Sequence, residues 1–211
     1  MNPRPRCPAC LRPHSACICR WATPVEHRTE VLILQHPGEV HEAKGTARLL
    51  HLSLPHSRVV TGERFDPGAL QSLLTAPWGP SDTSAPPRHA LLLYPEALQD
   101  AALGIAPPPP LDPTWLPRPE RLRLVVLDGT WRKSRKMLHL NPLLQQLPRL
   151  PLQALPTSRY RIRTARQPHQ LSTLEATCAA LAQLEGGAGR FAPLLAAFDG
   201  FVEQQAAWQG R

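Results

Sequence analysis

The sequence predicts an α/β protein with a mostly parallel sheet and helices on both faces. Four short runs rich in Val, Leu and Ile each stop at a proline, a glycine or an acidic turn, which is typical of buried parallel strands. These runs are residues 30–35, 58–60, 90–94 and 122–127. Helical stretches lie between most of them. The sequence therefore favours one main α/β domain.

Helical patterns account for most of the remaining chain. The predicted helical stretches are residues 39–54, 131–147, 172–185 and 192–208, the second broken near Pro142. Two proline-rich stretches, 75–89 and 104–119, are interpreted as stiff loops beside the core strands. A length of 211 residues suits one α/β domain with a small appendage. We expect a Cys-rich segment over 1–25 and the α/β domain over 26–211.

The composition favours a polyanionic partner. Lys and Arg total 24 against 16 Asp and Glu, which gives a net charge of +8. Charge alone fits RNA, DNA or an anionic membrane. No apolar run approaches the ~18–20 residues of a membrane-spanning helix, and the N-terminus lacks the apolar stretch of a signal peptide. We therefore expect a cytoplasmic protein, with a monomer as the favoured oligomeric state.

Four cysteines near the N-terminus follow the spacing C-x2-C-x6-C-x-C, as Cys7, Cys10, Cys17 and Cys19. A reducing cytoplasm argues against disulfides, and four thiolates within thirteen residues can surround one tetrahedral Zn²⁺. His14, inside the loop, could replace one of them. The zinc could hold an RNA-contacting surface or be purely structural. The fifth cysteine, Cys178, is expected to be a buried small residue of a helix.

The candidate centre of the active site is the sequence Asp128-Gly129-Thr130-Trp131, which follows the fourth strand. Open α/β folds place their chemistry at such strand ends. Asp128 could accept a proton or only cap the following helix, which begins near Thr130. Trp131 could stack on a base or pack in the core. Ser172 and Glu175 have the spacing of a helix capping box.

Cations cluster in two places after the fourth strand. An extended chain would project Arg159, Arg161 and Arg163 from one face, because they alternate with other residues. A row of guanidinium groups suits phosphates, although a solvated face without function is the alternative. His36 could contact the substrate or only end its strand. The predicted RNA-binding residues are His36, Arg132, Lys133, Arg135, Arg159, Arg161 and Arg163, with Lys136 beside them.

Several segments together resemble the DTW-domain family. They are the cysteine cluster and residues 34–50, 91–97, 127–138 and 171–176. The likeness spans roughly residues 7–185, and it departs from the family pattern at Gly45, where a polar residue is expected before Thr46. The resemblance implies a SPOUT-like fold whose C-terminal part forms a knot around S-adenosylmethionine. It also implies the activity of the bacterial members, which resemble tRNA-uridine aminocarboxypropyltransferases.

The resemblance also implies which residues meet the donor, S-adenosylmethionine. The donor-binding set is Leu93, Tyr94, Pro95, Leu127, Gly129, Leu171, Ser172, Thr173 and Glu175, with Glu175 favoured as structural. Ser172 and Thr173 could offer backbone amides to the donor carboxylate at a helix N-terminus.

The implied reaction moves the 3-amino-3-carboxypropyl arm of the donor to N3 of a uridine in tRNA and releases methylthioadenosine. N3 is a weakly acidic imide, so a carboxylate within reach could accept its proton, and Asp128 is our candidate. Thr130 and Trp131 complete the predicted catalytic set. A SPOUT-type RNA methyltransferase and a zinc-containing RNA-binding module without catalysis are the alternatives. The first would release S-adenosylhomocysteine, and the second would tolerate loss of Asp128.

Overall fold

The computed structural model describes residues 5–78, 86–95, 105, 107–153, 158 and 171–209. Its centre is a four-stranded sheet in which every pairing is parallel and the strand order is β2-β1-β4-β3. The strands are β1 (Glu30–Gln35), β2 (Ser57–Thr61), β3 (His89–Leu93) and β4 (Leu122–Asp128). Each begins and ends within one residue of a predicted run, so the predicted parallel sheet is confirmed.

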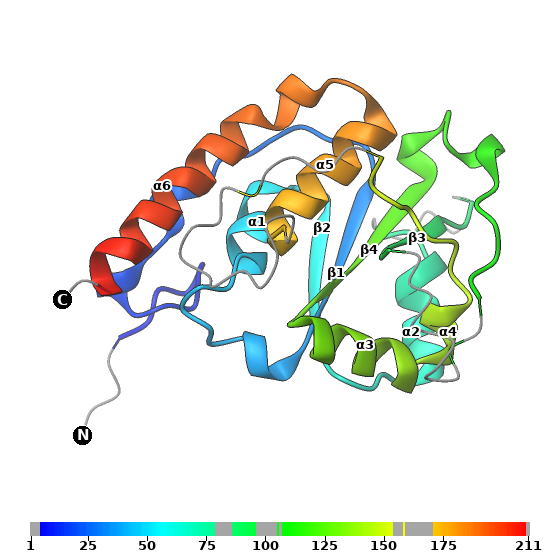
Figure 1. Ribbon diagram of the computed structural model, residues 1–211, viewed down its shortest axis with the longest axis horizontal. Helices are drawn as coiled ribbons and strands as arrows, with labels where there is room; N and C mark the ends of the chain where they lie inside the picture. The colour runs from blue at the N-terminus through cyan, green and yellow to red at the C-terminus, as the bar shows by residue number, and fades with distance from the viewer. Residues whose placement is uncertain are drawn as a thin grey trace.

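The sheet is covered on both faces because its strands have apolar side chains on both sides. In β1, Val31 and Ile33 join one buried cluster, and Leu32 and Leu34 join the other. The first cluster includes residues of α1 (Ala47–Ser53), α5 (Thr173–Glu185) and α6 (Ala192–Gln209). The second includes residues of α2 (Pro67–Thr75), α3 (Trp131–Leu140) and α4 (Pro142–Gln145). Figure 1 shows the two groups of helices on opposite sides of the sheet.

Two helices differ from the sequence prediction. The helix expected over 39–54 begins only at Ala47, after a short 3-10 turn over Pro37–Glu39. The helix α2 was not predicted, although Asp66 accepts a hydrogen bond from the Ala69 N–H (2.8 Å) and Pro67 occupies the first helical position. The predicted break near Pro142 is confirmed between α3 and α4.

The Cys-rich segment packs on the first cluster and along α6 (Figure 1). Cys10 and Ile18 are buried there with Phe198 of α6. Trp21 lies against Gly200, where a Cβ atom would come within 2.3 Å of the indole ring. A glycine in the middle of this helix is therefore explained by the close approach of Trp21.

The predicted knot in the C-terminal part of the chain stays a prediction, because residues 154–157 and 159–170 lie outside the described residues. None of the helices described is both long and apolar enough to cross a bilayer.

Candidate functional site

The carboxyl ends of β1 and β4 bring Gln35 and Asp128 together. These two residues are register partners, and β2 and β3 lie on the outer sides of the pair. Asp128 is 5% exposed, its Oδ2 accepts a hydrogen bond from Gln35 Nε2 (2.9 Å), and its Oδ1 accepts one from Thr173 Oγ1 (2.7 Å). The Asp128 carboxylate therefore joins β1, β4 and the start of α5 at the place where open α/β sheets bind ligands.

Asp128 is not the cap of the following helix. The N-cap of α3 is Thr130, whose Oγ1 accepts a hydrogen bond from the Lys133 N–H (3.4 Å). The alternative that Asp128 caps this helix was therefore wrong. The cap lies two residues later, because the chain passes through Gly129 before α3 begins. A Cβ atom at Gly129 would lie 3.1 Å from the Cβ of Lys133, so this turn is tightly packed.

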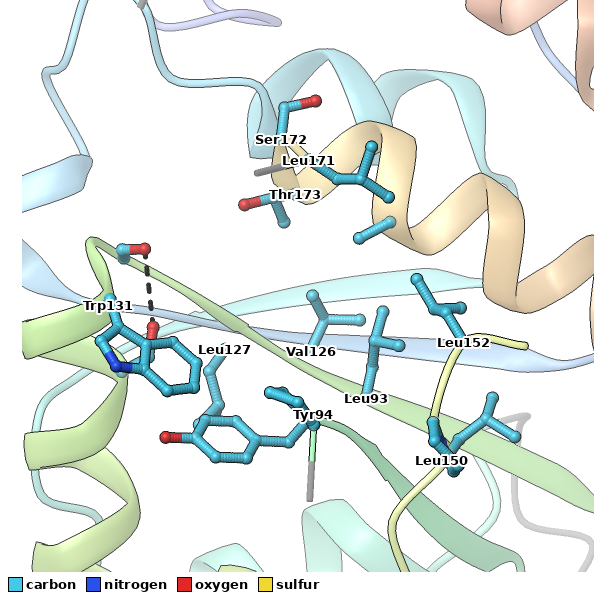
Figure 2. A pocket seen from close by; sticks show the side chains of 15 residues that line it. Leu93, Tyr94, Val126, Leu127, Trp131, Leu150, Leu152, Leu171, Ser172 and Thr173 are labelled. Atoms are coloured by element: carbon cyan, nitrogen blue, oxygen red, sulfur yellow. Dashed lines mark hydrogen bonds between the residues drawn. The ribbon is translucent and has the colours of Figure 1, made fainter. Parts of the chain in front are cut away.

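A cavity of about 530 Å³ opens beside these strand ends (Figure 2). Its floor is apolar and comes from β3 and β4, and its far end is closed by residues 150–152. Ser172 and Thr173 border it from α5. The lining residues are Leu93, Tyr94, Pro95, Val126, Leu127, Gly129, Trp131, Ser134, Leu150, Pro151, Leu152, Leu171, Ser172, Thr173 and Ala176.

The structure thus brings the predicted donor-binding residues together, with one exception. All of them line the cavity except Glu175, which is a buried residue of the first turn of α5. Residues 150–152 were not predicted. They reach the cavity because Leu92 and Arg149 form a parallel bridge at the outer edge of β3. No local sequence signal marks such a single-bridge contact.

Two stacked aromatic rings border the cavity. Tyr94 and Trp131 have ring centroids 5.1 Å apart and planes inclined by 16°. Trp131 is 39% exposed, so the alternative that it packs in the core was wrong. Figure 2 shows both rings at the end of the cavity away from Leu150 and Leu152. An exposed indole supported by a second ring is a suitable surface for a planar base.

The start of α5 borders the cavity, and most of its first amides already have acceptors. The predicted capping box is confirmed: Ser172 Oγ accepts from the Glu175 N–H (3.2 Å), and Glu175 Oε2 accepts from the Ser172 N–H (2.8 Å). The Ser172 amide is therefore already engaged. The Leu174 N–H donates to Thr46 Oγ1 (3.3 Å). Among the described residues none accepts from the Thr173 N–H, so this amide can meet an anionic group of a ligand.

The cations of α3 are partly neutralised by acids of neighbouring loops. Lys133 Nζ lies 2.7 Å from Glu39 Oε1, and Lys136 Nζ lies 2.9 Å from Glu63 Oε2. His36 Nε2 donates to Glu63 Oε1 (2.8 Å), because its Nδ1 accepts from the Gly38 N–H (3.0 Å). Hydrogen bonds from Lys136 and His36 hold the pKa of the Glu63 carboxyl below its usual range.

The other predicted RNA-binding residues have different settings. Arg132 is exposed and Arg135 is half-buried, and no ion pair to Arg132 is present in the described part of the chain. Arg159, Arg161 and Arg163 lie outside the described residues. The structure therefore leaves Arg132 as the α3 cation with the clearest access to a phosphate.

The four N-terminal cysteines form a compact cluster. The sulfur atoms of Cys7, Cys10, Cys17 and Cys19 all lie within 4.8 Å of one another, and two of the separations are 3.5 and 3.7 Å. Tetrahedral Zn²⁺ with Zn–S bonds of about 2.3 Å requires sulfur separations of about 3.8 Å, so the cluster fits this ion. Backbone N–H groups of Cys10 and Ala9 lower the pKa of the Cys7 thiol to about 6, whereas burial and the neighbouring sulfur atoms raise the pKa of Cys19, so the fit to zinc rests on the sulfur separations.

His14 is not part of this cluster as the described residues place it. The prediction for Cys178 is confirmed, because it is buried among apolar residues of α5. Burial raises the pKa of the Cys178 thiol to about 12. Cys178 therefore has the setting of an inert core residue.

The fold and the site define an α/β protein with a ligand cavity at the carboxyl edge of a parallel sheet and a separate four-cysteine centre. The chain belongs to the DTW domain family, whose model matches residues 4–206. The tRNA-uridine aminocarboxypropyltransferase 2 of Drosophila melanogaster is 32% identical over 199 residues, which cover 87% of this chain and 68% of that protein.

The protein of the same name from Macaca fascicularis is 29% identical over 186 residues, or 86% of this chain. This chain spans 57% of the Macaca fascicularis protein and 57% of its Mus musculus counterpart. No solved structure matches the chain.

Proposed function

We propose that this chain transfers the 3-amino-3-carboxypropyl group of S-adenosylmethionine to N3 of a uridine in tRNA. The names of its relatives and its membership of the DTW domain family support this activity. The observation that carries it is the cavity beside Asp128, which combines an apolar floor, a stacked aromatic pair and a helix amide.

The donor lies in this cavity with its two ends in different surroundings. Its adenosine packs on the apolar floor and meets backbone groups of Leu93–Pro95 and Leu127. Its carboxylate receives the Thr173 N–H at the positive end of the α5 dipole. This placement is supported by the engaged amides of Ser172 and Leu174, which leave Thr173 as the donor. Glu175 acts structurally, through the capping box.

The uridine stacks on Trp131 with its N3 directed toward the donor arm. A bond forms between N3 and the γ carbon of the arm, the bond from that carbon to sulfur breaks, and sulfur keeps the electron pair. Methylthioadenosine leaves, and Asp128 accepts the proton of N3. Asp128 Oδ2 accepts a hydrogen bond from Gln35 Nε2 and Oδ1 accepts one from Thr173 Oγ1, and these contacts hold the carboxylate in a fixed orientation.

The remaining predicted residues bind the RNA backbone around this opening. Arg132 carries the most accessible charge of α3, and Lys133, Arg135 and His36 lie beside it. The arginines at 159, 161 and 163 are part of the same proposal, because a row of guanidinium groups suits phosphates. A SPOUT-like fold with a C-terminal knot around the donor is also part of this proposal, and it rests on the family resemblance. Because these cations would neutralise phosphates of the RNA backbone, we expect tRNA binding to weaken as the salt concentration rises.

The activity is tested with S-adenosylmethionine that carries a label in the carboxyl group of the arm. Incubation with tRNA should place the label on uridine and release an equal amount of methylthioadenosine. Release of S-adenosylhomocysteine with unlabelled RNA would instead support the methyltransferase alternative. Intact donor after incubation with the full tRNA pool would support an RNA-binding module without catalysis.

The zinc proposal has its own test. Elemental analysis of the purified protein should find about one zinc per chain, and replacing Cys10 by Ser should abolish it. Cys178→Ser is the matched control, because Cys178 lies in the core and should not affect the metal content. Equal metal in wild type and Cys10→Ser would contradict the assignment.

A further inference from the structure

We infer that Arg12 and Thr46 are positioning residues that connect the four-cysteine cluster to the start of α5, and that they align the Thr173 amide for the donor carboxylate. The functional half of this inference rests on the proposed function. The structural half rests on a series of hydrogen bonds, joined by the peptide bond from Gly45 to Thr46, between parts of the chain that are far apart in sequence.

The series begins inside the cysteine cluster. The carbonyl of Ala9, between Cys7 and Cys10, accepts from Arg48 Nε of α1 (2.9 Å). The carbonyl of Arg12 accepts from the Cys7 N–H (2.8 Å), which holds Arg12 against the same turn. Metal binding at Cys7 and Cys10 would therefore fix the backbone that carries the Arg12 guanidinium.

Arg12 continues the series into the loop before α1. Its Nη1 donates to the carbonyl of Ala43 (2.6 Å) and its Nη2 to the carbonyl of Gly45 (2.9 Å). The guanidinium also lies over the ring of Phe201 of α6, 5.3 Å from its centroid. A planar group with two parallel donors holds two carbonyls in one orientation, which a lysine could not do. The residue that follows these carbonyls is Thr46.

Thr46 makes the contact with α5. It is 4% exposed, and its Oγ1 accepts from the Leu174 N–H, one of the first amides of α5. Helix amides in the first turn have no partner within the helix, so a buried one depends on an outside acceptor. Without this acceptor the first turn of α5 would open more easily, and Thr173 is the residue immediately before Leu174.

Thr173 therefore has two ties that set its position. Its side chain donates to Asp128 Oδ1 (2.7 Å), and its neighbour Leu174 donates to Thr46. The acceptor of the first hydrogen bond belongs to β4, and the acceptor of the second follows the loop whose carbonyls Arg12 contacts. The departure from the family pattern at Gly45 leaves this arrangement intact, because the contact uses the carbonyl of Gly45. A Cβ atom at Gly45 would lie 3.1 Å from the carbonyl oxygen of Glu42, which explains the glycine.

The test compares Thr46→Val, which keeps the shape and removes the acceptor, with Thr46→Ser, which restores it. Thr29→Val is the matched control. Thr29 is fully buried, and its Oγ1 has no hydrogen-bond partner in the described structure. Arg12→Met keeps the packing on Phe201 and removes both donors, and Arg20→Met is its control from the same segment. Zinc content is measured for every variant, so that loss of the metal is recognised.

The first readout needs no ligand. Hydrogen exchange of the amides from Leu174 to Ala176 should be faster in Thr46→Val and Arg12→Met than in wild type, Thr46→Ser, Thr29→Val or Arg20→Met. Unchanged exchange in both variants would overturn the inference. If Thr46→Val does not fold, Arg12→Met decides the outcome alone.

The second readout separates the arm of the donor from its nucleoside. Thr46→Val should bind S-adenosylmethionine about tenfold more weakly than wild type, as expected for a misaligned charged hydrogen bond. It should bind methylthioadenosine, which has no carboxylate, within about twofold of wild type. Equal weakening of both ligands would contradict a positioning role at the arm. If wild type binds neither ligand while exchange still rises, the proposed function fails and the structural connection stands.

Discussion

The two ends of the β1–β4 strand pair hold buried polar groups in opposite ways. At the amino end, Glu30 and Arg123 are register partners, and Arg123 Nε donates to Glu30 Oε2 (2.9 Å). Arg123 is fully buried, lies 4.1 Å from the centroid of the Trp78 ring, and donates to the carbonyl of Ala76 (2.7 Å). At this end the Arg123 charge is therefore paired with Glu30, packed against the Trp78 ring and hydrogen-bonded to a backbone carbonyl.

At the carboxyl end, the register partners are Gln35 and Asp128, and the carboxylate accepts from an amide and a hydroxyl group. The cavity opens immediately beside it. One strand pair thus carries a closed ion pair at one end and an acid next to a ligand cavity at the other. We therefore expect the amino end to contribute mainly to stability and the carboxyl end to the proposed reaction.

Asp128→Asn should have the largest effect on the reaction. The asparagine can still accept from Thr173, and Gln35 can turn its amide to accept from the new Nδ2, so both hydrogen bonds survive. Loss of the base should lower the single-turnover rate of methylthioadenosine release by about a hundredfold to ten-thousandfold. A rate within a few-fold of wild type, with both ligands bound, would assign Asp128 to positioning alone.

Arg123→Met should have the largest effect on stability. It removes the charge that faces Glu30 in a buried site, which typically costs about 3–5 kcal/mol of unfolding free energy. Urea denaturation measures this change. Arg88→Met is the control, since Arg88 also pairs with Glu30 (3.1 Å) but keeps 20% of its side chain exposed. A similar loss of unfolding free energy in both variants would mean that the burial of Arg123 adds nothing to the effect of its ion pair with Glu30.

Trp131→Ala should weaken tRNA binding without loss of fold. Stacking of one base on an aromatic side chain contributes about 1–3 kcal/mol, so we expect an affinity lower by about fivefold to 150-fold. Trp131→Phe should recover much of it. Trp115→Ala tests the other end of the sheet, because Trp115 stacks on His89 at the start of β3. Equal weakening by both alanine variants would show that RNA contacts the two ends alike.

Acid should destabilise the protein through a buried histidine that precedes β1. His27 Nδ1 donates to the Thr29 carbonyl (2.8 Å), and its Nε2 accepts from the His56 N–H (3.2 Å). Burial lowers the pKa of His27 in the folded protein below its value of about 6.5 in the unfolded chain. Just below pH 6.5, His27 is therefore protonated in the unfolded chain and still neutral in the folded protein, which favours unfolding. Stability is complete above about pH 6.5 and falls as the pH drops, by at most about 1.4 kcal/mol per pH unit for one histidine.

Denaturation at several pH values measures this slope. Burial lowers the pKa of His51 and His89 as well, so their contribution adds to that of His27. His27→Gln should give a shallower slope than wild type while keeping groups for both hydrogen bonds. An unchanged slope would assign the acid sensitivity to the other two histidines.

The sequence predicted the features that depend on neighbouring residues. The strands followed from runs of Val, Leu and Ile, and the capping box at Ser172 and Glu175 followed from its spacing. The cysteine cluster could also be predicted from the sequence, because its four cysteines lie within thirteen residues. The helix α2 could have been found from Asp66 and Pro67, which have the order of an N-cap and a first helical residue.

The features that the sequence could not supply join residues that are far apart. Gln35 meets Asp128, and Thr46 meets Leu174, only because parallel strands and α5 bring them together. The sequence also could not decide whether Trp131 is exposed or packs in the core, because this depends on its contact with Tyr94 and on the shape of the cavity. Sequence distance hides such pairs, although each residue alone has an ordinary polar or aromatic side chain.

The most direct test measures rate and stability together for Asp128→Asn and Arg123→Met. We expect a crossed result, in which Asp128→Asn loses at least about a hundredfold in single-turnover transfer while its unfolding free energy stays within about 1 kcal/mol of wild type. Arg123→Met should lose about 3–5 kcal/mol of stability and, under conditions where it is folded, transfer the arm at nearly the wild-type rate. If each variant lost rate and stability in parallel, the two ends of the strand pair would not have separate roles.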